Sequence, residues 1–171
     1  KLNVKSDYRL FFFMTVVTAL LAACYHGGKS GKKIFHYNEF NGISSLDPAF
    51  AKSQATMWPA HQLFNTLVEI DDSLHIIPSL AKSWDISADR TVFTFHLRND
   101  VFFHDDEAFE DGNGRKLMAG DVAYSFYRII DKKTASPGAW IFNSKVDTLE
   151  PFKALNDSTF QLKLLRPYNP I

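Results

Sequence analysis

Carboxylates crowd one short stretch of the sequence, and clustered carboxylates are the usual ligands of calcium. Asp105, Asp106 and Glu107 are followed closely by Glu110 and Asp111. A twelve-residue calcium loop needs oxygen donors at its positions 1, 3 and 5 and a Glu at position 12. No frame of this stretch meets that requirement. We therefore expect a solvated hairpin tip here and no metal site.

Histidine is the next residue type that could bind a metal or move a proton. A hairpin could bring His96 and His104 near each other, but His61 and His75 share no ligand spacing with them. We therefore predict that residues 96 and 104 are surface or half-buried strand residues. The sequence also lacks His-Glu-x-x-His and Gly-x-Ser-x-Gly, the motifs of zinc proteases and serine hydrolases. We expect no metal ion, no cofactor and no enzymatic activity.

The single cysteine stands at the end of an apolar run. Lys1, Lys5 and Arg9 precede the mostly apolar residues 10–24, a run shorter than the ~20 residues of a membrane-spanning helix. A basic start, a short apolar stretch and small residues at its end are typical of a secretory signal peptide. We predict such a peptide over residues 1–23.

The end of that run has a chemistry of its own. Leu21-Ala22-Ala23-Cys24 resembles the bacterial lipobox, in which the Cys thiol takes up a diacylglyceryl group and becomes the new N-terminus. We therefore predict lipid attachment at Cys24 and a location in the periplasm or at the cell surface, anchored to a bacterial membrane. Several acyl chains hold firmly, because each buried methylene contributes ~0.8 kcal/mol. Residues 24–33 are rich in Gly and Lys and are expected to form a flexible tether.

Charge and composition narrow the class of partner. Lys plus Arg and Asp plus Glu number 19 each, so the formal net charge is zero. A nucleic-acid binder needs a basic face for the phosphates, so we expect no nucleic acid as a partner. With 46% hydrophobic and 15% aromatic residues the chain can form a packed core, which excludes a disordered protein.

Apolar periodicity predicts the elements of the first half. Residues 34–37 are β-prone and predict a strand that enters a loop. From Pro59 to Val68, apolar residues fall on one helical face, which predicts a helix with Pro59 in its first turn. Residues 91–98 alternate and predict a strand that turns at Asn99-Asp100 and pairs with residues 101–104.

The same periodicity predicts which side chains face the core and two further elements. In the strand of residues 91–98, we expect Phe93, Phe95 and Leu97 to face the core. Residues 159–164 predict a second alternating strand, and residues 121–131 predict a helix. The apolar residues of these two elements are Phe160, Leu162 and Leu164 in the strand and Val122, Phe126, Ile129 and Ile130 in the helix.

Three segments, in their order and spacing, carry a resemblance to a known family. Residues 78–84, 94–105 and 121–126 closely resemble the signature region of the extracellular solute-binding proteins of family 5, the oligopeptide-, dipeptide- and nickel-binding proteins of ABC importers. Supporting matches lie at residues 45–48, 63–68, 134–137 and 156–160. The chain departs from the family pattern where Asp106 replaces a Gly, Glu107–Arg115 is inserted, and Met118 stands in place of a helix-capping Thr.

The resemblance implies an α/β fold of the two-lobed periplasmic-binding-protein class II, a clamshell that closes over its ligand by a hinge motion. By that comparison, residues 34–42 start lobe I. Residues 43–171 would form the extra α+β subdomain of lobe I, truncated at its C-terminal end. We expect the chain to be an N-terminal fragment of such a protein, without the second lobe.

The resemblance also implies where a ligand binds. In oligopeptide-type members the extended ligand pairs its backbone with strand-like segments of the protein, which is a form of β-augmentation. Asn41, Gly42, Ile43 and Ser44 match that place, and Gly42 would permit close approach. An ordinary Asn-Gly turn is the alternative. Trp140 is either the wall of a side-chain pocket or an aromatic core residue.

The function implied is that of the substrate-binding lipoprotein of an ABC transporter. It would capture peptides outside the cytoplasmic membrane and deliver them to the permease and ATPase subunits for import. A nickel chelate or an oligosaccharide stays open as the ligand. The alternative is a surface lipoprotein that acts as an adhesin or scaffold on the same fold. Genes for two permeases and ATPases beside the reading frame would favour transport.

Overall fold

The computed structural model describes residues 12, 14–16, 34 and 36–168. The chain divides into two units, Lys1–Asn38 and Glu39–Ile171. In the first unit, residues 12 and 14–16 are helical. No helix of the described ranges combines the length and the hydropathy needed to cross a bilayer. Cys24 and most of the predicted leader and tether lie outside the described residues, so the lipid anchor stays a prediction.

The strand predicted over residues 34–37 is wrong. Residues 34, 36 and 37 have no regular secondary structure and are exposed. A strand needs a neighbour to satisfy its backbone N–H and C=O groups, and none of the described strands pairs with this segment. β-propensity alone therefore did not produce a strand.

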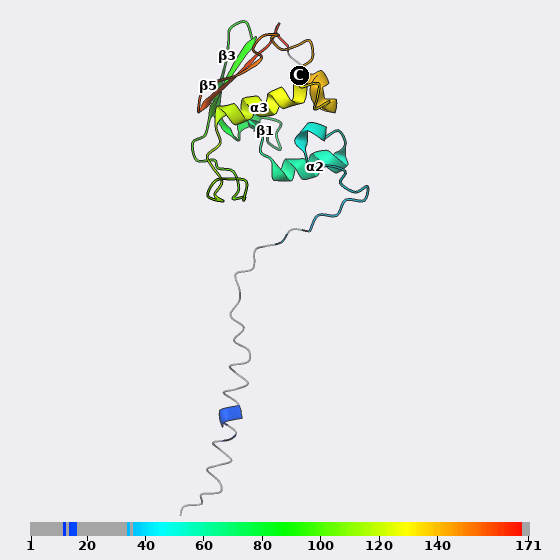
Figure 1. Ribbon diagram of the computed structural model, residues 1–171, viewed down its shortest axis with the longest axis vertical. Coiled ribbons are helices and arrows are strands. Elements are labelled where there is room, and N and C mark those ends of the chain that lie inside the picture. Colours follow the sequence, from blue (N-terminus) through cyan, green and yellow to red (C-terminus); the bar gives the residue numbers. More distant parts are fainter. Residues whose placement is uncertain (1–11, 13, 17–33, 35, 169–171) are drawn as a thin grey trace, which may run out of the picture. The chain divides into compact units, whose positions relative to one another are not determined.

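The second unit contains a four-stranded antiparallel sheet (Figure 1). Its strands are β3 (Ala81–Ile86), β4 (Val92–Leu97), β5 (Phe152–Asn156) and β6 (Thr159–Lys163), in the order β3-β4-β6-β5. The predicted strands over 91–98 and 159–164 are thus confirmed as β4 and β6. They pair with Phe95 opposite Phe160, and the two rings lie 6.1 Å apart.

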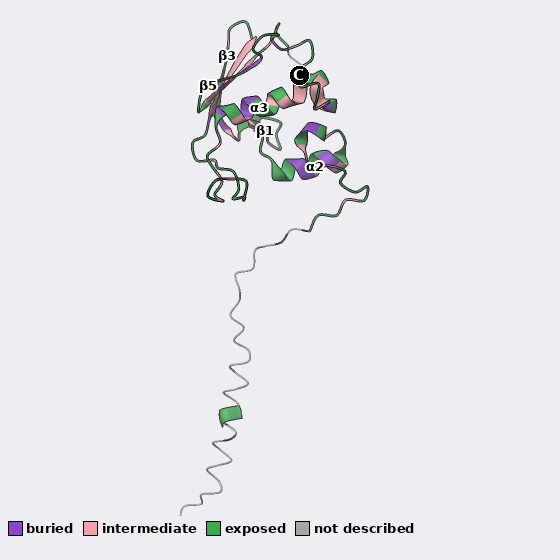
Figure 2. Cartoon of the chain, in the orientation of Figure 1, coloured by how far each residue is buried: buried purple, intermediate pink, exposed green. Residues whose placement is uncertain are grey.

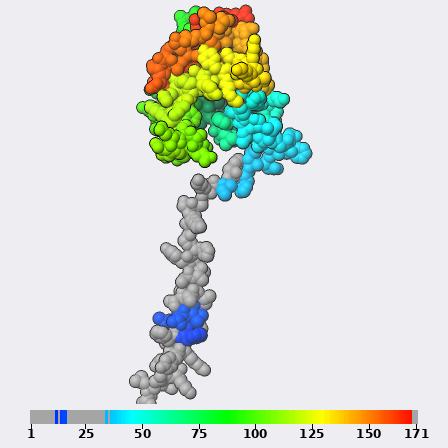
Figure 3. Space-filling model, in the orientation of Figure 1, coloured from blue at the N-terminus to red at the C-terminus, as the bar shows by residue number. Residues whose placement is uncertain are grey.

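The hairpin predicted after β4 is wrong. Both edges of β4 are occupied, by β3 and β6, so residues 101–104 have no place beside it. They pair instead with the segment beyond the acidic loop. Phe103 donates its backbone N–H to the carbonyl of Arg115 at 2.9 Å, and Leu117 donates to Val101 at 3.0 Å. The acidic residues therefore form the tip between these segments, as predicted, and in Figure 3 this light-green loop lies at the surface.

Helix α3 (Ala119–Ile130) packs on β5 and β6 and forms the core with the sheet (Figure 1). It begins two residues before its predicted start. Phe152, Phe160 and Leu97 are the largest fully buried side chains. The ring of Phe126 on α3 lies 5.3 Å from the rings of both phenylalanines. The predicted core register of β4 holds for Leu97, which is buried in the core, and for Phe95, which is half-buried and packs against it. Phe93 is also half-buried but is not among the residues packed against this core.

The start of α3 tests the predicted loss of a cap. Met118 occupies the N-cap position, and its side chain makes no cap hydrogen bond to the helix backbone. The carboxylate of Asp121 instead accepts from the backbone N–H of Met118 at 2.9 Å and pairs with Arg115. These bonds lower the pKa of Asp121, with the Arg115 guanidinium as the main cause. Asp121 thus replaces part of the missing cap.

The segment before the sheet holds η1 (Pro48–Phe50), α2 (Gln54–Leu63), and an antiparallel pair of β1 (Val68–Ile70) and β2 (Ile76–Pro78). The helix predicted from Pro59 to Val68 is misplaced. Ser53 and Thr56 start it earlier, because the Thr56 hydroxyl accepts from the backbone N–H of Ser53 at 3.2 Å. Pro59 therefore lies inside α2, and Val68 opens β1.

Candidate functional site

The segment Asn41–Ser44 lies exposed in the second unit and begins in a turn that a hydrogen bond from Gly42 to Glu39 closes. Gly42 has a φ of 69°, a backbone conformation that favours glycine. Its N–H donates to the carbonyl of Glu39 at 3.4 Å, and the N–H of Asn41 reaches the Glu39 carboxylate at 3.2 Å. Asn41 and Gly42 therefore lie in a turn, and ligand binding at this turn stays a prediction.

The turn is also accessible. A Cβ placed on Gly42 would meet no atom within 4 Å, and residues 41–44 are all exposed. Backbone N–H and C=O groups in such a segment can pair with an extended chain. Ligand contact at Asn41, Gly42, Ile43 and Ser44 stays a prediction.

Asp47 fixes the chain just beyond this turn. Pro48 requires an extended residue before it, and Asp47 has φ −72° and ψ 118°. The Asp47 carboxylate accepts from the backbone N–H of Ala49 at 3.0 Å and so caps η1. Ser45 accepts from the backbone N–H of Asp47 at 3.1 Å. Three short-range features therefore define the path of the chain from the turn into η1.

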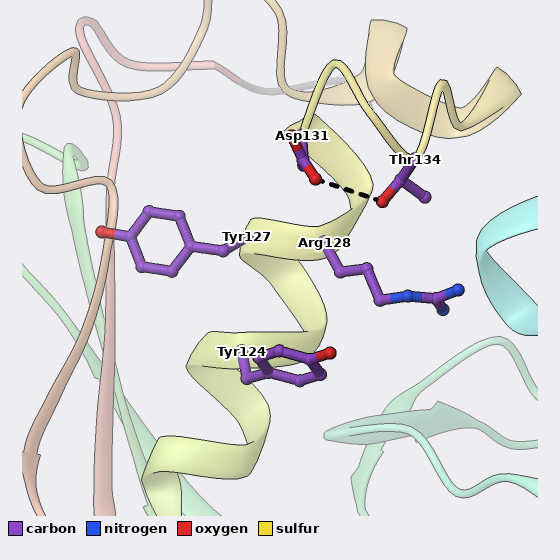
Figure 4. Close-up of a pocket in the computed structure, with 5 residues that line it drawn as sticks. All are labelled: Tyr124, Tyr127, Arg128, Asp131 and Thr134. Atoms are coloured by element: carbon purple, nitrogen blue, oxygen red, sulfur yellow. Dashed lines mark hydrogen bonds between the residues drawn. The ribbon is translucent and has the colours of Figure 1, made fainter.

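A guanidinium from α3 reaches the same carboxylate. Arg128 donates through Nη1 to Asp47 Oδ1 at 2.7 Å and through Nη2 to Oδ2. Figure 4 shows the Arg128 side chain extending away from α3. The pair is part-buried, with 36% of the Arg128 side chain and 29% of the Asp47 side chain exposed. The hydrogen bonds from Arg128 hold the pKa of Asp47 below its usual 3.8, so Asp47 is a carboxylate at neutral pH.

Ser136 makes a second attachment of η1. Its hydroxyl is buried and donates to the carbonyl of Ala49 at 2.5 Å. The same oxygen accepts from the backbone N–H of Gly138 at 3.1 Å, which caps η2 (Pro137–Ile141). η2 therefore packs on η1 through a satisfied buried hydroxyl.

A shallow surface pocket of about 300 Å³ lies along α3. It is lined by Tyr124, Tyr127, Arg128, Asp131 and Thr134 (Figure 4). Thr134 donates to Asp131 at 3.5 Å, and Tyr127 packs edge-on against Phe152 at 5.2 Å. The hydroxyl groups of Tyr124 and Tyr127 could contact polar groups of a ligand. The guanidinium of Arg128 is already paired with Asp47. We assign no ligand to this pocket.

Trp140 is not an aromatic core residue. It lies in η2 with 67% of its surface exposed, because the core is filled by the phenylalanines of α3 and the sheet. The Lys145 ammonium lies 5.2 Å from the Trp140 ring and donates to the Trp140 carbonyl at 3.0 Å. A role as a pocket wall stays a prediction.

The histidines are dispersed. His96 is a half-buried residue of β4 whose Nε2 lies 2.8 Å from the Asp85 carboxylate. His104 is exposed in the loop. Within the described ranges, no group of three His, Cys, Asp or Glu side chains could hold a metal ion.

Arg128 is the residue that the sequence analysis missed. It occupies the last turn of α3, where a basic residue also suits the helix dipole. Its partner lies 81 residues away in sequence. The motif Ser45-Leu46-Asp47-Pro48 contained the partner, but no local spacing connects the two.

Comparison with known proteins identifies the family. Residues 75–171 match the model of the bacterial extracellular solute-binding proteins, family 5 Middle. The chain belongs to this family. The resemblance drawn from the sequence motifs is thereby confirmed, and family 5 is a family of solute-binding proteins.

Individual relatives support the assignment. The chain is 34% identical over 134 residues to the di/tripeptide-binding protein 2 of Pseudomonas aeruginosa, which covers 73% of this chain and 25% of that protein. The periplasmic binding protein DppA of Helicobacter pylori, solved with the peptide STSA, is 34% identical with a TM-score of 0.63. The match covers 75% of this chain and 26% of that protein. NikZ of Campylobacter jejuni, solved with Ni(L-His), is 30% identical with a TM-score of 0.59. The match covers 77% of this chain and 23% of that protein.

The lengths and folds of these relatives show which part of a family 5 protein the chain covers. It spans about a quarter of the length of each of the three. The expected fold class, the two-lobed periplasmic-binding-protein fold of family 5, is confirmed, and the chain forms an α/β part of it. Family 5 relatives are periplasmic or extracellular binding proteins.

Proposed function

We propose that this chain belongs to the substrate-binding component of an ABC importer that captures short peptides outside the cytoplasmic membrane and delivers them to the permease and ATPase subunits. The observation that carries the proposal is the family 5 match over residues 75–171, together with a relative that is a di/tripeptide-binding protein. In this assignment, residues 34–42 start lobe I and residues 43–171 belong to its extra subdomain.

The ligand contact proposed for this chain is the turn Asn41–Ser44. The turn is exposed, and Gly42 leaves its backbone open to an approaching chain. A peptide would pair its own backbone with this segment, while the other lobe would cover the opposite side of the ligand. Trp140, exposed on η2, would contact a ligand side chain.

Calorimetric titration of the full-length protein tests the ligand class. We expect di- and tripeptides to bind in the micromolar range or tighter, on the order of −8 kcal/mol. A nickel–histidine complex and a mannose oligosaccharide serve as the competing ligand classes. Binding of either of these without peptide binding would replace the peptide assignment. Binding of none would favour the adhesin or scaffold role.

Two glycines provide a matched test of the turn. Gly42 and Gly112 share a φ of 69° and open surroundings, so an Ala at either position introduces the same backbone strain. We expect Gly42→Ala to weaken peptide binding about tenfold and Gly112→Ala, in the acidic loop, to leave it unchanged. Equal affinities for both variants would remove the turn from the ligand site.

We also propose that the protein is anchored through a lipidated Cys24. The lipobox-like Leu21-Ala22-Ala23-Cys24 at the end of an apolar run supports it. Expression in a bacterium with labelled palmitate should label the natural protein and a Thr18→Ser control, which keeps the cysteine. Cys24→Ser should carry no label. Label on Cys24→Ser would contradict the anchor.

A further inference from the structure

The ion pair between Arg128 and Asp47 differs from the others in its reach. Its partners are 81 residues apart, whereas the remaining ion pairs between described residues join neighbouring or adjacent segments. Arg98, for example, forms an equally bidentate pair with Asp100, two residues along. Arg128 therefore ties the start of the second unit to α3, whereas Arg98 ties only one loop to itself.

The tie lies next to the turn that we propose as the ligand contact. Asp47 follows Ser44 by three residues, and its extended backbone and the η1 cap set the direction of the chain there. The backbone N–H groups of Asn41 and Gly42 donate to Glu39, within the same stretch of chain. The chain that Asp47 holds is therefore one attachment of this stretch to α3.

We infer that Arg128 is a positioning residue for ligand binding, holding the Asn41–Ser44 turn in place through the Asp47 carboxylate. This inference rests on the proposed peptide-binding function. A ligand that binds a pre-positioned turn avoids the entropic penalty of ordering it, and that penalty otherwise reduces affinity.

The bidentate geometry makes the side-chain type important. A guanidinium presents two parallel N–H groups to a carboxylate and so fixes its orientation, whereas a lysine ammonium presents a point charge. Arg128→Lys, which keeps the positive charge but not the two parallel N–H donors, should therefore hold Asp47 less firmly than Arg128 does. Arg128 is also accessible beside the α3 pocket, so direct contact with a ligand carboxylate is the competing explanation.

The experiment compares Arg128→Gln, Arg128→Lys, Asp47→Asn and the double variant Asp47→Asn with Arg128→Gln in the full-length protein, with Arg98→Gln as the matched control. Peptide Kd is measured by calorimetry, and amide hydrogen exchange reports the mobility of residues 41–46. We expect Arg128→Gln to weaken binding roughly tenfold and to accelerate exchange in residues 41–46. Arg128→Lys should give a smaller loss, and Arg98→Gln should change neither quantity.

Asp47→Asn separates positioning from direct contact, because the amide oxygen can still accept from the N–H of Ala49 and keep the η1 cap while the ion pair with Arg128 is lost. Asp47→Asn should weaken binding and accelerate exchange as much as Arg128→Gln does, and the double variant should lose no more than either single variant. An affinity loss in Arg128→Gln that Asp47→Asn does not share would mean that Arg128 contacts the ligand itself, and would overturn the inference. Unchanged affinity or unchanged exchange in Arg128→Gln would also overturn it. If the natural protein bound no peptide at all, the proposed function would fail, and the inference with it.

Discussion

The two halves of the second unit are stabilised in different ways. In residues 81–168, α3 and the sheet enclose large apolar side chains, and Phe152, Phe160 and Leu97 are fully buried. In residues 39–80, the buried side chains Ala49, Thr56, Pro59 and Ala60 are all small or compact. Figure 2 shows buried segments on both α2 and α3, so the two halves differ in the size of the buried side chains.

The difference in buried side chains indicates which interactions stabilise each half. Burying an aromatic ring stabilises a fold by an area-proportional term, so residues 81–168 contain their own core. Residues 39–80 expose Trp58, Leu63 and Phe64 on and after α2. They are attached to the rest of the unit by the polar contacts of Asp47 with Arg128 and of Ser136 with Ala49, and by Leu67, which packs against the core.

A Phe→Ala substitution should reduce stability strongly in one half and hardly at all in the other. Phe160→Ala empties a fully buried position and should destabilise the protein by about 3–5 kcal/mol. Phe40→Ala, at a position that is 97% exposed, should change stability by less than about 0.5 kcal/mol. Urea denaturation followed by circular dichroism measures both. Comparable losses in the two variants would abolish the distinction between the halves.

Removing a polar attachment should have the next largest effect. Ser136→Ala leaves the buried carbonyl of Ala49 without its donor and should destabilise by about 1–3 kcal/mol. Ser158→Ala is the matched control, since its hydroxyl is exposed and bonds to Asn156. The same denaturation series measures the difference. A Ser136→Ala midpoint equal to the control's would show that η1 needs no such attachment.

Restoring the missing cap should stabilise the half that has the core. Met118→Thr supplies a hydroxyl that can accept from the backbone N–H of Asp121, and should add about 1 kcal/mol. Met118→Leu keeps an apolar side chain without the hydroxyl and should be neutral. If the threonine variant melted no higher than the leucine variant, Asp121 would already satisfy the helix terminus.

The smallest effect expected is pH-dependent. Because Arg128 lowers the pKa of Asp47 below 3.8 in the folded protein, the pair's contribution is complete above that value and is lost as the pH falls through the folded pKa. The natural protein should exceed Arg128→Gln in stability by less than about 1 kcal/mol near pH 6. This gap should close as the pH falls through the lowered pKa of Asp47. A stability difference that persists after Asp47 is protonated would show that the ion pair is not its cause.

Sequence patterns predicted the elements of one half better than those of the other. β4, β6 and α3 were predicted because each has one apolar face against a core that lies within the described chain. The pattern from Pro59 to Val68 also fits one helical face, yet Leu63 and Phe64 are exposed and the helix ends at Leu63. In that half, the Ser53 and Thr56 cap decided where the helix lies.

Local chemistry was therefore determined by the sequence itself. It established the extended backbone of Asp47 before Pro48, the Asn-Gly turn, the alternation of β4 and β6, and the motifs that identify family 5. These features depend on a residue and its immediate neighbours, and such information is present in a short stretch of chain.

Only the tertiary structure decided which distant groups meet. It placed β6 rather than residues 101–104 beside β4, left Trp140 exposed, and brought Arg128 to Asp47 across 81 residues. The physical reason is that the edge of a strand can pair with any other strand, and a carboxylate with any cation, that lies close enough in the folded chain. Which partner does so depends on the packing of α3 on the sheet, and no local spacing encodes it.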